Sequence, residues 1–320
     1  MNSPAQRTVA VIMDPIEQIT PYKDTSLAMM LEAQRRGWRV EYLLQSDMYM
    51  RDGTVSARRR RVELFDDNDR WFEVVDEVDD AFVGVDVVLM RTDPPVDDEY
   101  LYTTWMLDRV EDAGTLVANP PSALRAVNEK MFTAGFSHCM SPTLVTSGPQ
   151  RIRDFLAEHG DIILKPLNLM GGASIFRLRT DDPNIGVVIE TMTGHGTQSI
   201  MAQKFIPEIT AGDKRILVIG GEPVPFALAR IPSVGETRGN LAAGGRGVAQ
   251  PLSDRDRWIV DQVAPTLVKR GLLFVGLDVI GDYLTEINVT SPTCVRELDS
   301  QCELNIAGTF FDLLDQKLGA

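Results

Sequence analysis

Short apolar runs alternate with helical patterns through the first third of the chain, and this alternation narrows the possible folds more than any other feature. Runs such as Val9–Met13 predict buried strands, while residues 25–36 and 100–113 carry apolar side chains three and four apart, which predicts helices. Strands that alternate with helices usually pair in parallel and are covered by those helices. We therefore expect an N-terminal α/β domain with a mostly parallel sheet.

A predicted hairpin near the C-terminus carries three oxygen-bearing side chains. Asp278 lies in its first strand, and Glu286 and Asn288 lie two residues apart in its second. Side chains two apart share one face of a strand, and a turn at Gly281-Asp282 brings Asp278 to that face. Two carboxylates and an amide oxygen suit Mg²⁺ that also binds phosphates. A solvent-facing strand with alternating polar residues is an equally good interpretation of the spacing.

Lysines placed among apolar residues form a second candidate feature. Lys165 ends an apolar run and precedes a turn that contains Gly171 and Gly172. A lysine that leaves a buried strand beside backbone N–H groups can hold a phosphate. Lys130 is another candidate, although a surface lysine with a buried aliphatic stem is the more ordinary interpretation of Lys130 alone. It lies in segment 122–137, which we expect to form one helix.

Residues 233–247 show no periodicity and are rich in glycine, which predicts a long loop. Arg238 and Arg246 lie within it. A flexible loop with arginines suits a lid that closes to exclude water from a labile intermediate, and an insertion without a role is the alternative. A separate basic run, Arg58–Arg61, is predicted to be a solvated surface loop.

The composition excludes several classes of protein. The formal net charge of the 320 residues is −14, which argues against nucleic acid as the main partner. No apolar run reaches the ~20 residues of a membrane-spanning helix, and residues 1–8 lack the apolar core of a signal peptide. The three cysteines do not suggest a disulfide framework. We therefore expect a cytoplasmic protein that binds neither nucleic acid nor membranes.

The order of these features resembles the ATP-grasp ligases, and in detail the bacterial glutathione synthetases. The likeness extends in order from about residue 9 to residue 297, and its most specific segments are ETRGNLAAGGRG at 236–247 and LTEINVTSPT at 284–293. Further similar segments are 13–16, 90–95, 128–130, 163–167, 171–174 and 212–215. One departure stands out, since Asn168-Leu169 replaces the usual Asp-Gly before Met-Gly-Gly. Because leucine lacks the access of glycine to positive φ, we expect a stiffer or differently shaped loop.

The resemblance implies an ATP-dependent carboxylate–amine ligase. ATP would phosphorylate the cysteinyl carboxylate of γ-glutamylcysteine, and the amine of glycine would then displace phosphate and give glutathione. Mg²⁺, or alternatively Mn²⁺, would be the metal, and the enzyme would be a homo-oligomer. Such chemistry requires positioning and charge neutralisation and no covalent nucleophile.

The resemblance also implies roles for individual residues. ATP-binding roles fall on Lys130, Lys165, Gly171, Gly172, Gln203, Lys204, Phe205, Ile206 and Asp213. Asp278, Glu286 and Asn288 would bind the metal. Arg91, Ser291 and Thr293 would bind the peptide. Arg215, Arg230 and Arg238 would be catalytic, with Arg238 in a lid over residues 231–247.

The fold class implied is α/β, with α+β organisation in the C-terminal part. Residues 1–122 would form the N-terminal domain on the substrate side. An ATP-grasp domain of two α+β subdomains would follow, with residues 123–205 covering ATP. Residues 206–320 would carry the flexible loop and the metal site.

Three alternatives remain at this stage. The first is another ATP-grasp ligase, which joins two amino acids or adds glutamate to a protein. The second is a non-catalytic ATP-binding module, although such a module has no need of both the metal residues and the lid arginines. The third is a nicotinamide-dependent dehydrogenase, which the missing glycine fingerprint after Val9–Met13 disfavours.

Overall fold

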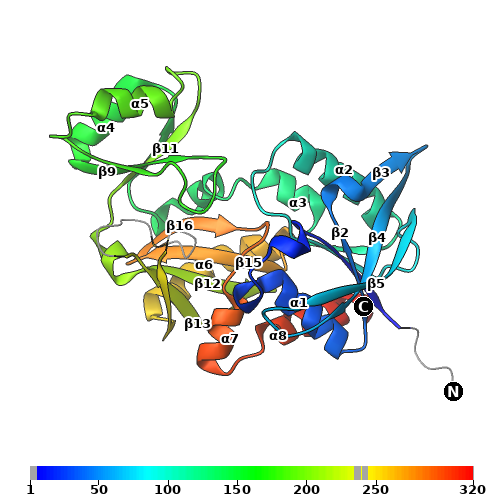
Figure 1. The fold of residues 1–320 in the computed structure, drawn as a ribbon. Helices are drawn as coiled ribbons and strands as arrows, with labels where there is room; N and C mark the ends of the chain where they lie inside the picture. Colours follow the sequence, from blue (N-terminus) through cyan, green and yellow to red (C-terminus); the bar gives the residue numbers. More distant parts are fainter. Residues whose placement is uncertain (1–5, 234–238, 240–243, 320) are drawn as a thin grey trace.

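The computed structural model describes residues 6–233, 239 and 244–319, which form three bodies, each built on one sheet (Figure 1). The N-terminal sheet has the strand order β3-β4-β2-β1-β6-β7, with β5 paired to β4. Its strands are β1 (Thr8–Ile12), β2 (Arg39–Leu43), β3 (Met48–Arg51), β4 (Thr54–Leu64), β5 (Phe72–Ala81), β6 (Val87–Met90) and β7 (Leu116–Ala118). The helices α1 (Thr25–Arg35) and α2 (Asp98–Asp112) connect its parallel strands.

The centre of this sheet is parallel, as the alternating pattern predicts. The strands β2, β1, β6 and β7 are parallel neighbours, whereas β3, β4 and β5 extend the sheet with antiparallel pairs. The prediction that Arg58–Arg61 is a surface loop is wrong, because these residues lie in β4. Arg59 is buried there and pairs with Glu41 of β2 (Nε to Oε2, 2.6 Å) and with Asp80 of β5. Acidic side chains on the two neighbouring strands thus neutralise Arg59.

The central body is a four-stranded antiparallel sheet with its own core. The strand order is β10-β9-β11-β8, formed by β8 (Thr143–Thr146), β9 (Asp161–Pro166), β10 (Phe176–Arg179) and β11 (Ile200–Lys204). The helices α4 (Pro149–His159) and α5 (Ile185–Met192) pack on it through Ile152, Leu156 and Ile189. Figure 1 shows this green body standing apart from the other two.

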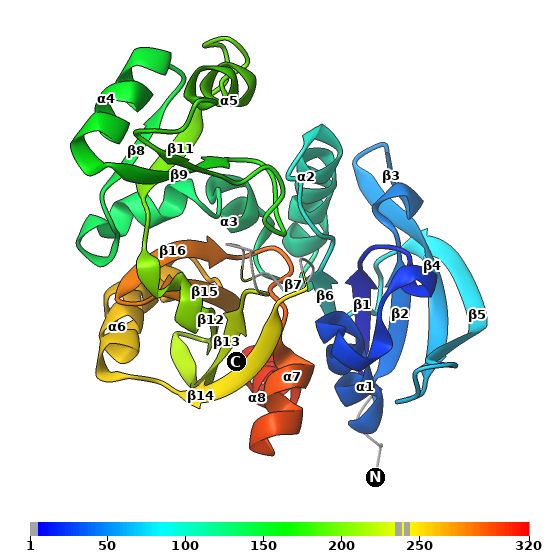
Figure 2. The same ribbon diagram turned by 60° about the vertical axis from the view of Figure 1, so that its left-hand side comes forward.

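The C-terminal body is a five-stranded antiparallel sheet. Its order is β14-β13-β12-β15-β16, formed by β12 (Asp213–Ile219), β13 (Glu222–Ile231), β14 (Arg246–Pro251), β15 (Phe274–Ile280) and β16 (Tyr283–Asn288). Three helices pack on it: α6 (Asp254–Lys269), α7 (Val295–Cys302) and α8 (Ile306–Gly319). The hairpin of β15 and β16 is confirmed, and both views place β16 on the side of the sheet that faces the central body (Figures 1 and 2). Strand β14 begins at Arg246, inside the segment predicted to be loop.

The single helix predicted over 122–137 is wrong. The structure has α3 (Pro121–Ala126) and a 3₁₀ segment, Met131–Cys139, with a break between them. At the break the Asn128 carboxamide accepts hydrogen bonds from the N–H groups of Lys130 and Met131 and donates one to Leu167 O. These side-chain bonds replace the helical ones. Glu129 and Lys130, which follow Asn128, line a cleft between the bodies.

The N-terminal and C-terminal bodies share their core, which spans both sheets. One cluster joins Val88 and Leu107 to Ile216 and Val275. Residues 123–139 contribute to that shared cluster, whereas the separate core of the central body begins near residue 144. The predicted domain limits, 1–122, 123–205 and 206–320, stay predictions. Within the described part of the chain, no helix is long and apolar enough to span a membrane.

A pH-dependent stability change is expected at the junction of α7 and α8. The Asp299 carboxylate accepts a hydrogen bond from Ile306 N (3.0 Å), and burial raises the pKa of Asp299 to about 6. Because the folded pKa exceeds the unfolded value, stability is lost as the pH rises through about 6. Asp299→Asn keeps the accepting oxygen and removes the charge. We expect a gain of about 1 kcal/mol at pH 7.5 that vanishes below about pH 4.

Thermal unfolding at several pH values measures this effect. The matched control is Asp261→Asn, which changes an exposed aspartate on α6. A gain for Asp299→Asn that does not depend on pH would contradict the assignment.

Candidate active site

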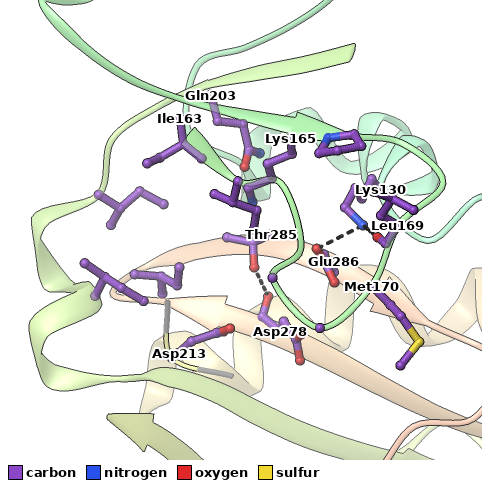
Figure 3. Close-up of a pocket in the computed structure, with 18 of the residues that line it drawn as sticks. Lys130, Ile163, Lys165, Leu169, Met170, Gln203, Asp213, Asp278, Thr285 and Glu286 are labelled. Carbon is purple, nitrogen blue, oxygen red and sulfur yellow. Dashed lines mark hydrogen bonds and ion pairs between the residues drawn. The ribbon is translucent and has the colours of Figure 1, made fainter. Parts of the chain in front are cut away.

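A cleft of about 820 Å³ separates the sheet of the central body from that of the C-terminal body (Figure 3). Ile163, Lys165 and Gln203 enter it from the central sheet, and Asp278 and Glu286 enter it from the other. All nine residues predicted to bind ATP line this cleft: Lys130, Lys165, Gly171, Gly172, Gln203, Lys204, Phe205, Ile206 and Asp213. Residues far apart in the sequence therefore meet as the predicted ATP site requires.

A second and larger cleft, about 1910 Å³, lies between the N-terminal and C-terminal bodies. It is lined by the three predicted peptide-binding residues, Arg91, Ser291 and Thr293. The predicted catalytic arginines Arg215 and Arg230 line it as well. The two clefts share five lining residues, namely Lys130, Met170, Gly171, Asp278 and Glu286. A group bound in one cleft can therefore reach a group bound in the other at these residues.

Strand register explains how the three predicted metal residues meet. Asp278 of β15 lies directly opposite Glu286 of β16, and Asn288 lies opposite Gly276, two residues before Asp278. The alternation of side chains then places all three on one face. The amide nitrogen of Asn288 donates to Gly276 O (3.3 Å), which orients its carboxamide. Among the described residues no group of three or more His, Cys, Asp or Glu side chains forms a metal cluster. The candidate set instead has two carboxylates and one amide.

Two buried arginines hold the Asp278 carboxylate. Arg215 reaches it with Nε (2.5 Å) and Nη2 (3.1 Å), and Arg230 reaches it with Nη2 (2.9 Å). Burial alone would raise the pKa of Asp278, but the two guanidiniums outweigh it and hold the pKa well below its ordinary value. Burial likewise would lower the pKa of Arg215 and of Arg230, and the carboxylates raise both instead. All three groups are therefore charged.

Asp213 connects this cluster to the first cleft, which it also lines. Its Oδ2 accepts a hydrogen bond from Arg230 Nη2 (2.6 Å), whereas its Oδ1 is buried and has no partner within the described residues. Burial raises the pKa of Asp213 to about 6 despite the neighbouring arginine. A buried carboxylate oxygen without a donor is costly, so a ligand with a hydroxyl or amine donor would bind well at this point.

The two lysines have different surroundings. Lys130 Nζ donates to Leu169 O (2.7 Å) and lies 3.4 Å from Glu286 Oε1 (Figure 3). Lys165 is buried, and that burial lowers the pKa of its ammonium, against the opposing effect of Glu286 and Asp213. Neither lysine is a surface lysine with a solvated head, so the alternative for Lys130 is wrong.

The glycine turn after β9 does not require a glycine at position 169. Positive φ values fall on Gly171 (65°), Gly172 (79°) and Ser174 (55°), whereas Leu169 does not have one. The side chain of Leu169 lines the first cleft and is exposed. The departure at Asn168-Leu169 therefore changes the lining of the cleft and imposes no strained backbone.

Sequence reasoning missed two polar residues that hold the site together. Glu129 is partly buried, and its Oε1 accepts hydrogen bonds from Val289 N (2.8 Å), Thr290 N and the Thr290 hydroxyl. Arg91, which was predicted to bind the peptide, donates to Ser26 Oγ (3.1 Å) and to Pro292 O (3.0 Å), and burial lowers its pKa to about 10. Asp93, also missed, bonds to the Ser291 hydroxyl. Glu129 and Asp93 both lie in segments on which the resemblance rests, 128–130 and 90–95, and that resemblance was the signal that could have found them. Arg238, which is predicted to be catalytic, lies outside the described residues.

Comparisons with known proteins agree with this arrangement. The solved structure of the ATP-grasp ligase PsnB is similar over 98% of both chains, with a TM-score of 0.63 at 19% identity. The chain thus has the fold of the ATP-grasp ligases. Two sequence models describe most of its length: the N-terminal domain of prokaryotic glutathione synthetase matches residues 8–125, and the corresponding ATP-grasp domain matches residues 129–303.

Relatives named glutathione synthetase are close in sequence. Those of Pseudomonas putida and Pseudomonas syringae are 57% and 56% identical over 98% of this chain and 98% of their own length. The chain belongs to the prokaryotic glutathione synthetase family and is an ATP-dependent ligase. Membership implies that ATP and a divalent metal ion take part in the reaction. A different amino-acid ligase, a non-catalytic module and a dehydrogenase are not favoured.

Proposed function

We propose that this enzyme joins γ-glutamylcysteine to glycine, with ATP as the energy source, and releases glutathione, ADP and phosphate. The observation that carries the proposal is the junction of the two clefts at Lys130, Asp278 and Glu286. A γ-phosphate that enters from the first cleft would meet a carboxylate held in the second. Phosphoryl transfer needs this in-line placement more than it needs a covalent catalyst.

In the first cleft, the charges and the hydrogen-bonding groups suit a nucleoside triphosphate. Lys130 and Lys165 would bind phosphate oxygens, and the backbone at Gly171 and Gly172 would approach them closely. The strand end 203–206 would bind the adenine ring. The free Oδ1 of Asp213 would accept a hydrogen bond from the nucleoside.

The oxygen ligands that the β15–β16 hairpin presents fit a hard divalent cation. Asp278 and Glu286 supply carboxylate oxygens and Asn288 supplies an amide oxygen from the same face. We infer Mg²⁺ as the ion, with Mn²⁺ as the alternative. When bound, it would neutralise charge on the phosphate oxygens.

The peptide would bind in the second cleft, where Arg91, Ser291 and Thr293 would hold its polar groups. A cysteinyl carboxylate oxygen would attack the γ-phosphorus, so that the bond from phosphorus to ADP breaks and an acyl phosphate forms. The free amine of glycine would then attack the carbonyl carbon, lose a proton, and expel phosphate. Arg215 and Arg230 would stabilise the negative charge that develops in both steps. Asp278 and Asp213 hold these two arginines in place.

Oxygen labelling tests this sequence of steps. With ¹⁸O in both positions of the cysteinyl carboxylate, one labelled oxygen should leave in each released phosphate, because that oxygen bridges carbon and phosphorus in the intermediate. Glutathione should keep the other. Unlabelled phosphate alongside glutathione would exclude the acyl phosphate. Arg238 as a catalytic residue, a lid over 231–247, a cytoplasmic location and a homo-oligomer stay predictions within this proposal.

A further inference from the structure

Arg177, which no motif singles out, stacks on the ring of Phe205. Its Cζ lies 3.5 Å from the ring centroid. Arg177 is on β10, and Phe205 directly follows β11 at the start of the connection to the C-terminal body. The two strands are not neighbours, since β9 lies between them. The contact therefore crosses the middle strand of the central sheet.

That middle strand supplies the residue that fixes both partners. Asp161 of β9 accepts hydrogen bonds from Arg177 Nε (2.9 Å) and Nη2 (2.6 Å), each to a different carboxylate oxygen. The backbone carbonyl of Asp161 accepts a third hydrogen bond, from Phe205 N (3.0 Å). A forked pair of this kind fixes the plane of a guanidinium, which a lysine cannot reproduce. Asp161 thus sets the Phe205 backbone and, through Arg177, its ring.

Phe205 lines the first cleft, whereas Arg177 is not one of the described residues that line it. The guanidinium covers one face of the ring, and Phe205 contacts the cleft with another part of its surface. We propose that Arg177 is a positioning residue for the nucleotide. Held by Asp161, Arg177 fixes the ring of Phe205, which forms one wall of the part of the first cleft that binds the base. This inference rests on the proposed ATP site and assigns a purine base as the group that contacts the ring.

The physical reason is that the stack restricts the rotation of the Phe205 ring before the nucleotide binds. A partly buried phenylalanine at a strand end can rotate about its side-chain bonds, and ordering it on binding costs free energy. A cation over one face holds the ring by attraction to its π-electrons. The opposite face or edge is then presented in one orientation, ready to contact a planar base.

Replacing Arg177 tests the proposal by a change in nucleotide affinity. Arg177→Met keeps an aliphatic chain and removes the cation. We expect ADP, measured by calorimetry with Mg²⁺, to bind roughly fivefold more weakly and the KM for ATP to rise by a similar factor. The KM values for the other two substrates should stay the same, and kcat at saturating ATP should change less than twofold. Arg177→Lys should give an intermediate affinity.

The matched control is Arg179→Met, which removes an exposed arginine two residues along the same strand. It should bind ADP as the unaltered enzyme does. Phe205→Leu should also weaken ADP binding, and Arg177→Met should add little to it, because the arginine acts through the ring. A general loss of stability would instead weaken binding in both backgrounds.

The outcomes separate the inference from the function on which it rests. If Phe205→Leu weakens ADP binding and Arg177→Met does not, the positioning role is wrong and the ATP site stands. If neither Phe205→Leu nor Lys165→Met changes ADP binding, the ATP site itself is misplaced. Full additivity of the Arg177 and Phe205 substitutions would also overturn the inference.

Discussion

Glu286→Gln should lower kcat at least about a hundredfold and leave the protein folded. Glu286 lines both clefts, lies opposite Asp278 and is 3.4 Å from Lys130 Nζ. Glutamine has the same shape but lacks the negative charge that the lysine and a metal ion require. Removing one preorganised group that stabilises charge in a transition state typically costs about 10²–10³ in kcat. Because glutamine matches glutamate in shape, the packing around this side chain, 22% of which is exposed, should be kept.

The measurement is the steady-state rate at several Mg²⁺ concentrations, together with thermal unfolding. The matched control is Asp282→Asn, an exposed acid in the turn just before β16. Activity within threefold of the control would remove Glu286 from the metal site. A large loss of stability would show that its role is structural.

Asn119→Ala should destabilise the fold by about 3–5 kcal/mol. Asn119 follows β7 and is buried, and its carboxamide makes four hydrogen bonds to the C-terminal body. Oδ1 accepts from Leu273 N (2.7 Å) and Phe274 N (3.1 Å), while Nδ2 donates to Phe274 O (2.9 Å) and Val289 O (2.8 Å). Alanine would leave these buried backbone groups without partners, each at a cost of about 1–3 kcal/mol before relaxation.

Heat and denaturant unfolding measure this loss, and the expected fall in Tm is roughly 10 °C. Asn68→Ala is the matched control, since Asn68 is exposed in the connection between β4 and β5. A fall in Tm of less than about 2 °C would mean that water replaces the four bonds at little cost. The N-terminal and C-terminal bodies would then be held together by their shared apolar core alone.

The sequence was sufficient for the parts of the fold that local patterns encode. Apolar alternation predicted the parallel centre of the first sheet, and period-two spacing predicted that Asp278, Glu286 and Asn288 share a face. Both signals are local, since each depends on residues within one strand or one hairpin. Strands β4 and β5 were not predicted. Their charged residues pair with each other across the two strands, and such pairing produces no apolar periodicity in the sequence.

The ion cluster and the interdomain bonds could not be predicted from local patterns. Arg215 meets Asp278 only because β12 pairs with β15, and Asn119 reaches Phe274 across 155 positions of sequence. The Arg177–Phe205 stack likewise depends on the order of three strands. At Leu169, the expectation of a constrained turn assumed that the residue needed positive φ, and the structure places that requirement at Gly171 and Gly172 instead.

The most direct test of the account is phosphate release from ATP and Mg²⁺ with γ-glutamylcysteine and glycine supplied together and then omitted in turn, with the product identified by mass. We predict release only when both are present, with one glutathione formed for each phosphate. Release without glycine at the full rate, or no glutathione from folded enzyme that binds ATP, would contradict the proposed reaction.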